Sequence, residues 1–216
     1  MDPKAVLFDF DGTLADTLPL AFSAFQTVFK KYDGREVSIE ELIAMFGPTE
    51  DEILRSHLQH REKIDEAISE YYEEYRRGHF TAMNSPAIIK LLTVLKQGGK
   101  KIGVITGKSR RALEISAKYL NLSDFFDCVI TGNDVARPKP HPEGILKALD
   151  YFGAGKHDAV FLGDSNADIQ AGKAAGVRTY AVQWLPTVQH SVFELQPDAI
   201  LKNTAEFLRL IHLEEC

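Results

Sequence analysis

The chain has 216 residues, 44% of them hydrophobic and 26% charged, and a formal net charge of -6 at pH 7. This length suits one well-buried core with a modest additional module better than two equal, independent domains. The acidic balance argues against non-specific attraction to nucleic acid or to an anionic membrane surface. No run approaches the ~20 consecutive apolar residues of a membrane span, so the composition predicts a soluble globular protein.

The first residues and the cysteines predict the cellular compartment. Acidic residues stand where a signal peptide would carry a basic and then an apolar run. The only two cysteines, Cys128 and Cys216, cannot form a disulfide framework. We therefore expect a cytoplasmic protein with no nucleic-acid partner and no membrane partner. Whether it is a monomer or a homodimer is left open by the sequence.

Hydrophobic periodicity alternates between strand-like and helix-like segments through most of the chain, which is typical of an α/β fold with a parallel sheet. Amphipathic helices are predicted from Ala87 to Gln97, from Arg110 to Leu120 and from Glu143 to Phe152. The predicted strands are Ala5 to Phe10, Lys101 to Thr106, Asp127 to Ile130, Ala159 to Gly163, Thr179 to Val182 and Ala199 to Leu201.

The region from about Leu14 to Met83 interrupts this alternation, because it holds several helical patterns and no convincing strand. Ser38 and Thr49 each begin a capping-box pattern. The segment from Arg61 to Gly78 is predicted to be one long, charged helix with apolar residues on one face. These patterns indicate an inserted all-helical module.

We expect residues 1–15 and 84–216 to form a doubly wound α/β core and residues 16–83 to form the helical module. The module could serve stability alone as a surface bundle. It could also act as a lid, since both of its ends return to the mouth of the sheet beside Asp9 and Asp11.

Four segments with reactive side chains follow predicted strands. The carboxyl ends of parallel strands meet at one edge of a doubly wound sheet, so these segments are expected to converge on one crevice. Each segment alone has an ordinary explanation as a turn, a helix cap or a solvated lysine. All four together favour a functional site. They are Asp9-Phe10-Asp11, Thr106-Gly107-Lys108, Lys139-Pro140 and Asp164 to Asp168.

These residue types suit phosphoryl transfer through an aspartyl-phosphate intermediate, in which a carboxylate is the nucleophile. Asp9 would attack phosphorus, while Asp11 would protonate the leaving oxygen and later take a proton from water. Lys139 would stabilise the nucleophile and the transferring group. The Thr106 hydroxyl and the backbone N–H of Gly107 would hold the phosphoryl oxygens.

The carboxylates of these segments would repel one another, by roughly 4 kcal/mol for a pair ~4 Å apart at an effective dielectric of ~20. A positive charge must offset that repulsion. Oxygen ligands without clustered histidine or cysteine favour Mg²⁺ over Zn²⁺. We therefore expect a Mg²⁺ site that involves Asp9, Asp11, Asp164 and Asp168.

Taken in order, the segments resemble the motifs of the haloacid dehalogenase superfamily, in its phosphoglycolate phosphatase and β-phosphoglucomutase-like branch with a helical cap. The resemblance covers nearly the whole chain. It implies a Rossmann-like core, and a metal held by the side chains of Asp9 and Asp164 and by the backbone carbonyl of Asp11. Asp168 would be a further ligand or would lie just behind the ligands. The matching stretches are Asp9 to Thr17, Val104 to Lys108, Arg137 to Glu143 and Gly163 to Gly176.

Within this resemblance, the leading expectation is a magnesium-dependent phosphatase for a small phosphomonoester of the phosphoglycolate or sugar-phosphate type. Asp11 argues against dehalogenation, because a departing halide needs no acid. The cap turn from Phe46 to Thr49 has no arginine or lysine to hold a second phosphate, as a mutase requires. Arg55 lies near enough in sequence to keep the mutase open. A phosphonatase would need a cap lysine, and Lys63 is interpreted as solvated.

An inorganic pyrophosphatase on the same core also stays open. A catalytically idle relative that binds a phosphorylated ligand or a partner protein is a further alternative, although the intact acidic residues and Lys139 argue against it. The expected partner is a small phosphorylated metabolite. Four cap residues are candidates to face it: Phe46, Thr49, Arg55 and His57.

Several other residues have modest interpretations. Asp16 and Thr17 are interpreted as caps of the first helix of the module, and His141 as a loop or cap residue rather than a base. Trp184 is expected to pack in the core. Cys128, inside a predicted strand, is expected to be a small buried apolar residue.

Overall fold

The computed structural model describes residues 2–81, 84–187 and 189–213. Its sheet has six strands in the order β3-β2-β1-β4-β5-β6, and every neighbouring pair is parallel. The first strand of the chain is therefore central, paired on one side with β2 and on the other with β4. The strands are β1 (Ala5–Phe8), β2 (Lys101–Ile105), β3 (Cys128–Ile130), β4 (Ala159–Gly163), β5 (Arg178–Val182) and β6 (Ala199–Leu201).

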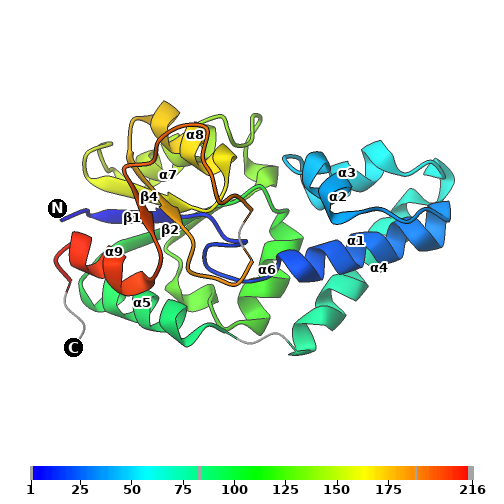
Figure 1. Cartoon of the computed structure of the whole chain (residues 1–216), viewed down its shortest axis with the longest axis horizontal. Coiled ribbons are helices and arrows are strands. Elements are labelled where there is room, and N and C mark those ends of the chain that lie inside the picture. The colour runs from blue at the N-terminus through cyan, green and yellow to red at the C-terminus, as the bar shows by residue number, and fades with distance from the viewer. Residues whose placement is uncertain (1, 82–83, 188, 214–216) are drawn as a thin grey trace.

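Helices cover both faces of the sheet (Figure 1). Alternate residues of β1 enter different apolar clusters, with Val6 and Phe8 in one and Ala5 and Leu7 in the other, because side chains of a strand point in turn to opposite faces. This arrangement confirms the predicted α/β, Rossmann-like doubly wound sheet. One face packs against α5 (Pro86–Gln97), α6 (Arg110–Tyr119) and α9 (Thr204–Leu210), and the other against α7 (Glu143–Phe152) and α8 (Asn166–Ala175).

The predicted boundaries differ from the observed ones mainly at the carboxyl end of β1. We expected this strand to continue to Phe10, but it ends at Phe8. The reason is local: the carbonyl of Phe10 accepts hydrogen bonds from the backbone N–H groups of Thr13, Leu14 and Ala15, which turns the chain away from the sheet. Asp9 therefore stands just beyond the strand. For the other strands and for α5, α6 and α7 the predicted ends are correct or shifted by one residue.

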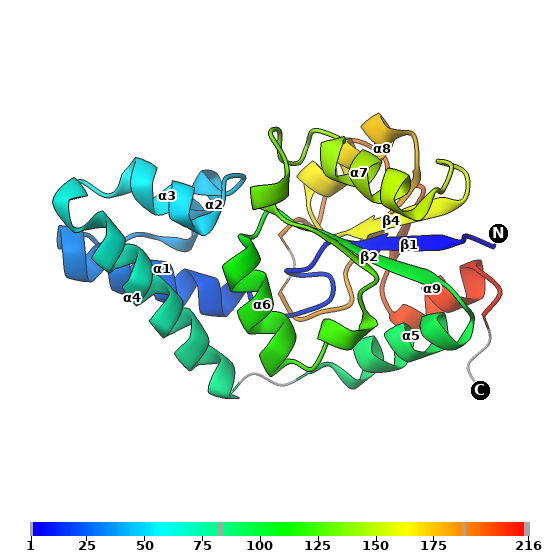
Figure 2. The same ribbon diagram turned by 180° about the vertical axis from the view of Figure 1, so that it is seen from behind.

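A separate helical body lies at the carboxyl end of the strands (Figures 1 and 2). It has its own apolar core, in which Phe25, Leu54 and Tyr71 are fully buried. Its helices run from residue 18 to residue 78, and the predicted boundary at residue 83 lies outside the described residues. They are α1 (Leu18–Asp33), α2 (Ile39–Met45), α3 (Glu50–His57) and α4 (Ile64–Gly78).

Both predicted capping boxes are present in this helical body. The backbone N–H of Ser38 donates to the Glu41 carboxylate at 2.7 Å, and that of Thr49 donates to the Glu52 carboxylate at 2.8 Å. The long helix predicted from Arg61 instead begins with a 3-10 turn, Arg61–Lys63, before α4.

Within the described residues, none of the helices has both the length and the apolar character needed to span a bilayer. Cys128 is buried in β3, as expected. Cys216 lies outside the described residues.

Two stacked tyrosines in the helical body allow a matched test of hydroxyl pairing. Tyr71 and Tyr75 are both fully buried, but only the Tyr75 hydroxyl has a partner among the described residues, the Ser116 hydroxyl at 2.8 Å. We expect Tyr71→Phe to raise the free energy of unfolding by ~1 kcal/mol and Tyr75→Phe to lower it by a similar amount. Denaturant titration measures both, and a Tyr71→Phe protein less stable than its parent would contradict the prediction.

Candidate active site

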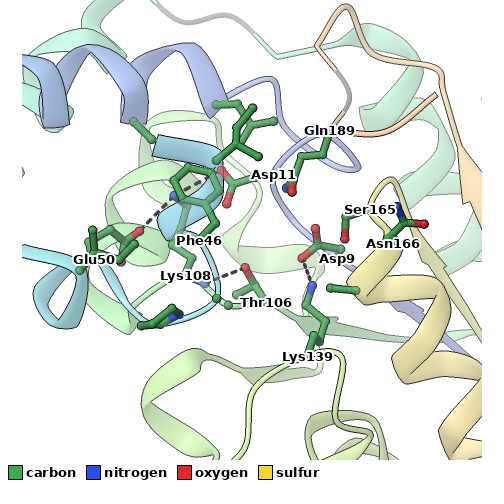
Figure 3. A pocket seen from close by; sticks show the side chains of 18 of the residues that line it. Asp9, Asp11, Phe46, Glu50, Thr106, Lys108, Lys139, Ser165, Asn166 and Gln189 are labelled. Carbon is green, nitrogen blue, oxygen red and sulfur yellow. Dashed lines mark hydrogen bonds and ion pairs between the residues drawn. The ribbon is translucent and has the colours of Figure 1, made fainter. Parts of the chain in front are cut away.

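A cavity with a volume of about 370 Å³ lies between the carboxyl end of the sheet and the helical body (Figure 3). Its size is within the range of sites that hold small molecules. All four segments predicted from the sequence contribute to its wall, so the predicted convergence is present. The core residues with polar groups that line it include Asp9, Asp11, Thr106, Gly107, Lys108, Lys139, Ser165, Asn166, Gln189 and His190.

Lys139 joins the first acidic segment to the last. Its Nζ atom lies 2.6 Å from Oδ1 of Asp9 and 2.6 Å from Oδ1 of Asp168, and it also donates to the carbonyl of Ile105 at 3.2 Å. Burial alone would lower the pKa of Lys139, but the Asp168 and Asp9 carboxylates outweigh burial and raise it. The lysine is therefore a permanent positive charge between two acids.

One lysine does not neutralise the carboxylates gathered here. Burial and the nearby Asp168 raise the pKa of Asp9 to about 7, although Lys139 opposes this shift. Burial, Asp168 and Asp9 likewise raise the pKa of Asp164. These shifts mean that the folded protein resists holding all of its carboxylates ionised, so a further positive charge would be bound favourably.

Asp9, Asp164 and Asp168 form a buried group whose ligand oxygens lie within 4.8 Å of one another. Gly12, with a φ of +76°, passes so close to this group that a Cβ atom on it would lie 2.2 Å from Oδ2 of Asp164. Only glycine leaves the carboxylate room. The hard oxygen donors of this group are of the kind that bind a divalent cation.

The predicted acids occupy different places around this group. Asp168 is held by the protein on both oxygens, since Oδ2 accepts the backbone N–H and the hydroxyl of Ser165 and Oδ1 contacts Lys139. Its side chain is thus engaged before any cation binds. Asp11 is not part of the group of side chains formed by Asp9, Asp164 and Asp168, and the expected role of its backbone carbonyl stays a prediction.

Asp11 is instead fixed by contacts of its own. The hydroxyl of Thr17 donates to Oδ1 of Asp11 at 2.5 Å, and Nζ of Lys108 lies 3.3 Å from the same oxygen. This corrects the prediction for two residues: Thr17 occupies the N-cap position of α1 but its side chain makes no cap, and Asp16 is exposed. The acidic side chain, rather than the helix start, takes the threonine hydroxyl.

The turn after β2 presents polar groups to the cavity. The hydroxyl of Thr106 accepts the backbone N–H of Lys108 at 3.2 Å, so its own proton is available to an oxygen in the cavity. Gly107 follows it directly, and Ser109 caps α6 by accepting the N–H of Ala112. The turn therefore ends at the amino terminus of a helix, where anions are favoured.

Sequence reasoning missed Glu50 and Gln189 and assigned no role to Lys108. Glu50, at the start of α3, lies 3.4 Å from Nζ of Lys108 and accepts the N–H of Ser109 at 2.7 Å. Its position beside the Thr49 capping box gave it an ordinary explanation as an acid in a first helical turn. The backbone N–H of Gln189 donates to Oδ2 of Asp164 at 2.7 Å, and no local pattern marks that loop.

The helical body supplies an apolar wall. Of the four candidate cap residues, only Phe46 lines the cavity, while Thr49, Arg55 and His57 do not. Arg55 is paired with Asp65 at 2.9 Å on the exposed surface. Lys63 is also exposed, as predicted. The described apolar side chains of the helical body that line the cavity are Leu18, Ala21, Phe25, Ile43, Phe46, Pro48 and Ile53.

Two further interpretations from the sequence are confirmed. Nδ1 of His141 accepts the backbone N–H of Glu143, the first residue of α7, at 3.2 Å, so His141 supports a helix start. Trp184 packs against the core, and its ring N–H donates to the carbonyl of Thr13 at 2.7 Å.

The fold agrees with the comparisons to known proteins. A family model for haloacid dehalogenase-like hydrolases matches residues 6–182. The chain belongs to this family, and it is an enzyme that hydrolyses phosphoric compounds. It is 32% identical to the pyrophosphatase PpaX of Bacillus pumilus, over 96% of each chain. It resembles the structure of CbbY from Rhodobacter sphaeroides in complex with phosphate, with a TM-score of 0.81, 26% identity, and coverage of 95% of this chain and 96% of that one.

Repulsion among the buried carboxylates predicts the pH dependence of stability. Because the folded protein raises the pKa of Asp9 from 3.8 to about 7, it binds more protons than the unfolded chain between these values. The free energy of unfolding of the metal-free protein should therefore fall as the pH rises from about 4 to about 7. Asp164→Asn removes one repelling charge, and its amide oxygen can still accept the N–H of Gln189. We expect the free energy of unfolding of Asp164→Asn to fall less steeply as the pH rises, and its melting temperature near neutral pH to be a few degrees higher than that of the parent.

Thermal melts of both proteins in chelator, across about pH 5 to pH 7, measure this difference. Other titrating groups, such as His79, whose pKa is lowered by burial, contribute equally to the pH dependence of both proteins, so their contribution drops out of the difference. If the melting temperatures of the parent and of Asp164→Asn changed with pH in parallel, repulsion among the buried carboxylates would not be what lowers the stability.

Proposed function

We propose that this protein is a magnesium-dependent phosphatase that hydrolyses a small phosphomonoester through an aspartyl-phosphate at Asp9. The observation that carries the proposal is the position of Asp9. It stands just beyond the central strand, faces the cavity, and has Lys139 at 2.6 Å and two further carboxylates beside it. A nucleophile, a fixed cation and a cation-binding group thus meet at one point.

The first half of the reaction joins Asp9 to phosphorus. Oδ2 of Asp9, the oxygen not bonded to Lys139, would attack while the bond to the leaving oxygen breaks. The Thr106 hydroxyl, the turn N–H of Gly107 and the Lys139 ammonium would bind the phosphoryl oxygens. A Mg²⁺ ion held by the side chains of Asp9 and Asp164 and the carbonyl of Asp11 would supply the positive charge that lets an anionic ester approach an anionic nucleophile.

Asp11 is the proposed acid and base. Its proton would pass to the leaving oxygen, and its carboxylate would then take a proton from the water that attacks the phosphorylated Asp9. Its place in the cavity wall and the contacts on its Oδ1 atom support this role. We further propose that the helical body, residues 16–83, is a cap that covers this chemistry, because side chains from α1, α2 and α3 close the far side of the cavity.

The apolar cap wall favours a monoester with a small, largely uncharged leaving group over a mutase. A mutase must hold a second phosphate, and none of the described cap residues that line the cavity is cationic. A pyrophosphatase is the second candidate. Lys108 in the cavity wall could contact a leaving phosphate, and PpaX is named for that activity. Glu50 already engages that lysine, which argues for the monoester.

Removal of the nucleophile tests the mechanism. We expect hydrolysis of p-nitrophenyl phosphate to require Mg²⁺ and to fall by ~10³-fold or more in Asp9→Asn, because no other carboxylate occupies the position of attack. Asp158→Asn, which changes an acid paired with Lys4 on the surface, is the control and should retain full activity. Rates that survive Asp9→Asn, or survive a chelator, would refute the mechanism.

Relative activity on two substrate classes tests the specificity. With Mg²⁺ present, we expect kcat/KM for phosphomonoesters with a small, uncharged leaving group to exceed that for pyrophosphate by ~10-fold or more, since a charged leaving group would face the apolar wall and Glu50. Steady-state assays of released phosphate measure both. A higher kcat/KM for pyrophosphate would contradict the assignment as a phosphomonoesterase and favour a pyrophosphatase.

A further inference from the structure

We propose that Lys108 and Glu50 are positioning residues that aim Asp11 at the leaving oxygen, and that they do so only while the helical body rests on the core. The inference rests on the proposed function, because it assigns the support of the acid in that reaction. Its basis is a continuous buried chain of three side chains, Glu50, Lys108 and Asp11, which crosses from one body to the other (Figure 3).

The ammonium of Lys108 is the centre of this chain. Its side chain is only 3% exposed, and its Nζ atom lies 3.3 Å from Oδ1 of Asp11 and 3.4 Å from Oε1 of Glu50. The ring of Tyr75 covers it at 4.7 Å from the ring centre. A buried ammonium surrounded in this way is confined by its partners, since leaving them would strand a charge without water.

Glu50 ties this lysine to the position of the helical body. It is the first residue of α3, yet its carboxylate reaches the core and accepts the backbone N–H of Ser109 at 2.7 Å. The preceding turn rests directly on the core: a Cβ atom on Gly132 would lie 2.6 Å from Cγ2 of Thr49. If the helical body lifted away, Glu50 and the ring of Tyr75 would withdraw from Lys108, and of these three contacts only Asp11 would remain.

The contacts on Asp11 explain what the lysine does. Thr17 and Lys108 both bind Oδ1, whereas Oδ2 accepts no hydrogen bond within the described residues. Fixing one oxygen orients the other. In the proposed reaction, Oδ2 gives its proton to the leaving oxygen as the bond from phosphorus to that oxygen breaks and the bond from Asp9 to phosphorus forms. The resulting carboxylate later takes one proton from the attacking water, and Lys108 keeps its charge throughout.

This role predicts an effect that depends on the leaving group. Phenyl phosphate and p-nitrophenyl phosphate have similar shapes, but phenoxide is the more basic leaving group and depends more on a proton donor. We expect Lys108→Met to lower kcat/KM for phenyl phosphate by ~10²-fold and that for p-nitrophenyl phosphate by less than ~10-fold. Glu50→Gln can still accept the N–H of Ser109. We expect it to lower kcat/KM by less than Lys108→Met does, again with a greater loss for phenyl phosphate than for p-nitrophenyl phosphate.

Tyr72→Phe is the matched control. The hydroxyl of Tyr72 contacts Ser109 at 2.8 Å and also bonds Asp51, so it joins the same two surfaces without touching Asp11. A substitution that affects only the contact between the helical body and the core should change kcat/KM for both substrates by the same factor. If Lys108→Met leaves Glu50 too poorly compensated for folding, the double replacement Lys108→Met with Glu50→Gln removes both charges and is measured instead.

If Lys108→Met and Glu50→Gln lowered kcat/KM equally for the two substrates, the inference would be wrong, and the ion pair between Lys108 and Glu50 would have a structural role only. Failure of the proposed function has a different signature, because the parent protein would then hydrolyse neither ester or would retain activity in Asp9→Asn. Asp11→Asn supplies the reference for complete loss of the acid. The ratio of its loss in kcat/KM on phenyl phosphate to its loss on p-nitrophenyl phosphate should be at least as large as that of Lys108→Met.

Discussion

The close approach of like charges at the carboxyl end of the sheet is the constraint that organises this protein. Asp9 follows β1 and Asp164 follows β4, and these strands are neighbours, so the backbone itself brings the carboxylates together. The Lys139 ammonium offsets part of the repulsion, and the raised pKa of Asp9, to about 7, shows that part remains. The remainder makes the site receptive to a divalent cation and then to an anionic ester.

The helical body contributes in a different way. Among the described residues, its side of the cavity is apolar except for Glu50, which engages Lys108 and the start of α6. Charge is thus concentrated on the core side of the cavity. An apolar wall lowers the local dielectric, and a lower dielectric strengthens the electrostatic interactions beside it.

The fold was largely predictable because its signals are local. Periodicity identified the strands, and the acidic segments after β1 and β4 were found because reactive residues at strand ends are unusual. The fixed contacts around Asp11 were not predictable. Thr17 could be interpreted as a helix cap, because its position just before a helix gives no sign that its hydroxyl turns back to Asp11. Glu50 could be interpreted as an ordinary acid in a helical turn, since nothing in its neighbourhood reveals a partner more than fifty residues away. The Gln189 contact arises from tertiary packing alone.

The central place of β1 also affects how the protein is made. This strand precedes the other five strands of the sheet in the chain, yet it pairs with strands that begin at residues 101 and 159. Its two edges therefore stay without hydrogen-bond partners until those strands have been synthesised, and the candidate nucleophile Asp9 lacks Lys139 until that residue has been added. A growing chain consequently carries this carboxylate without the groups that surround it in the folded protein, and the candidate site is assembled only after the loop at Gln189 has been made.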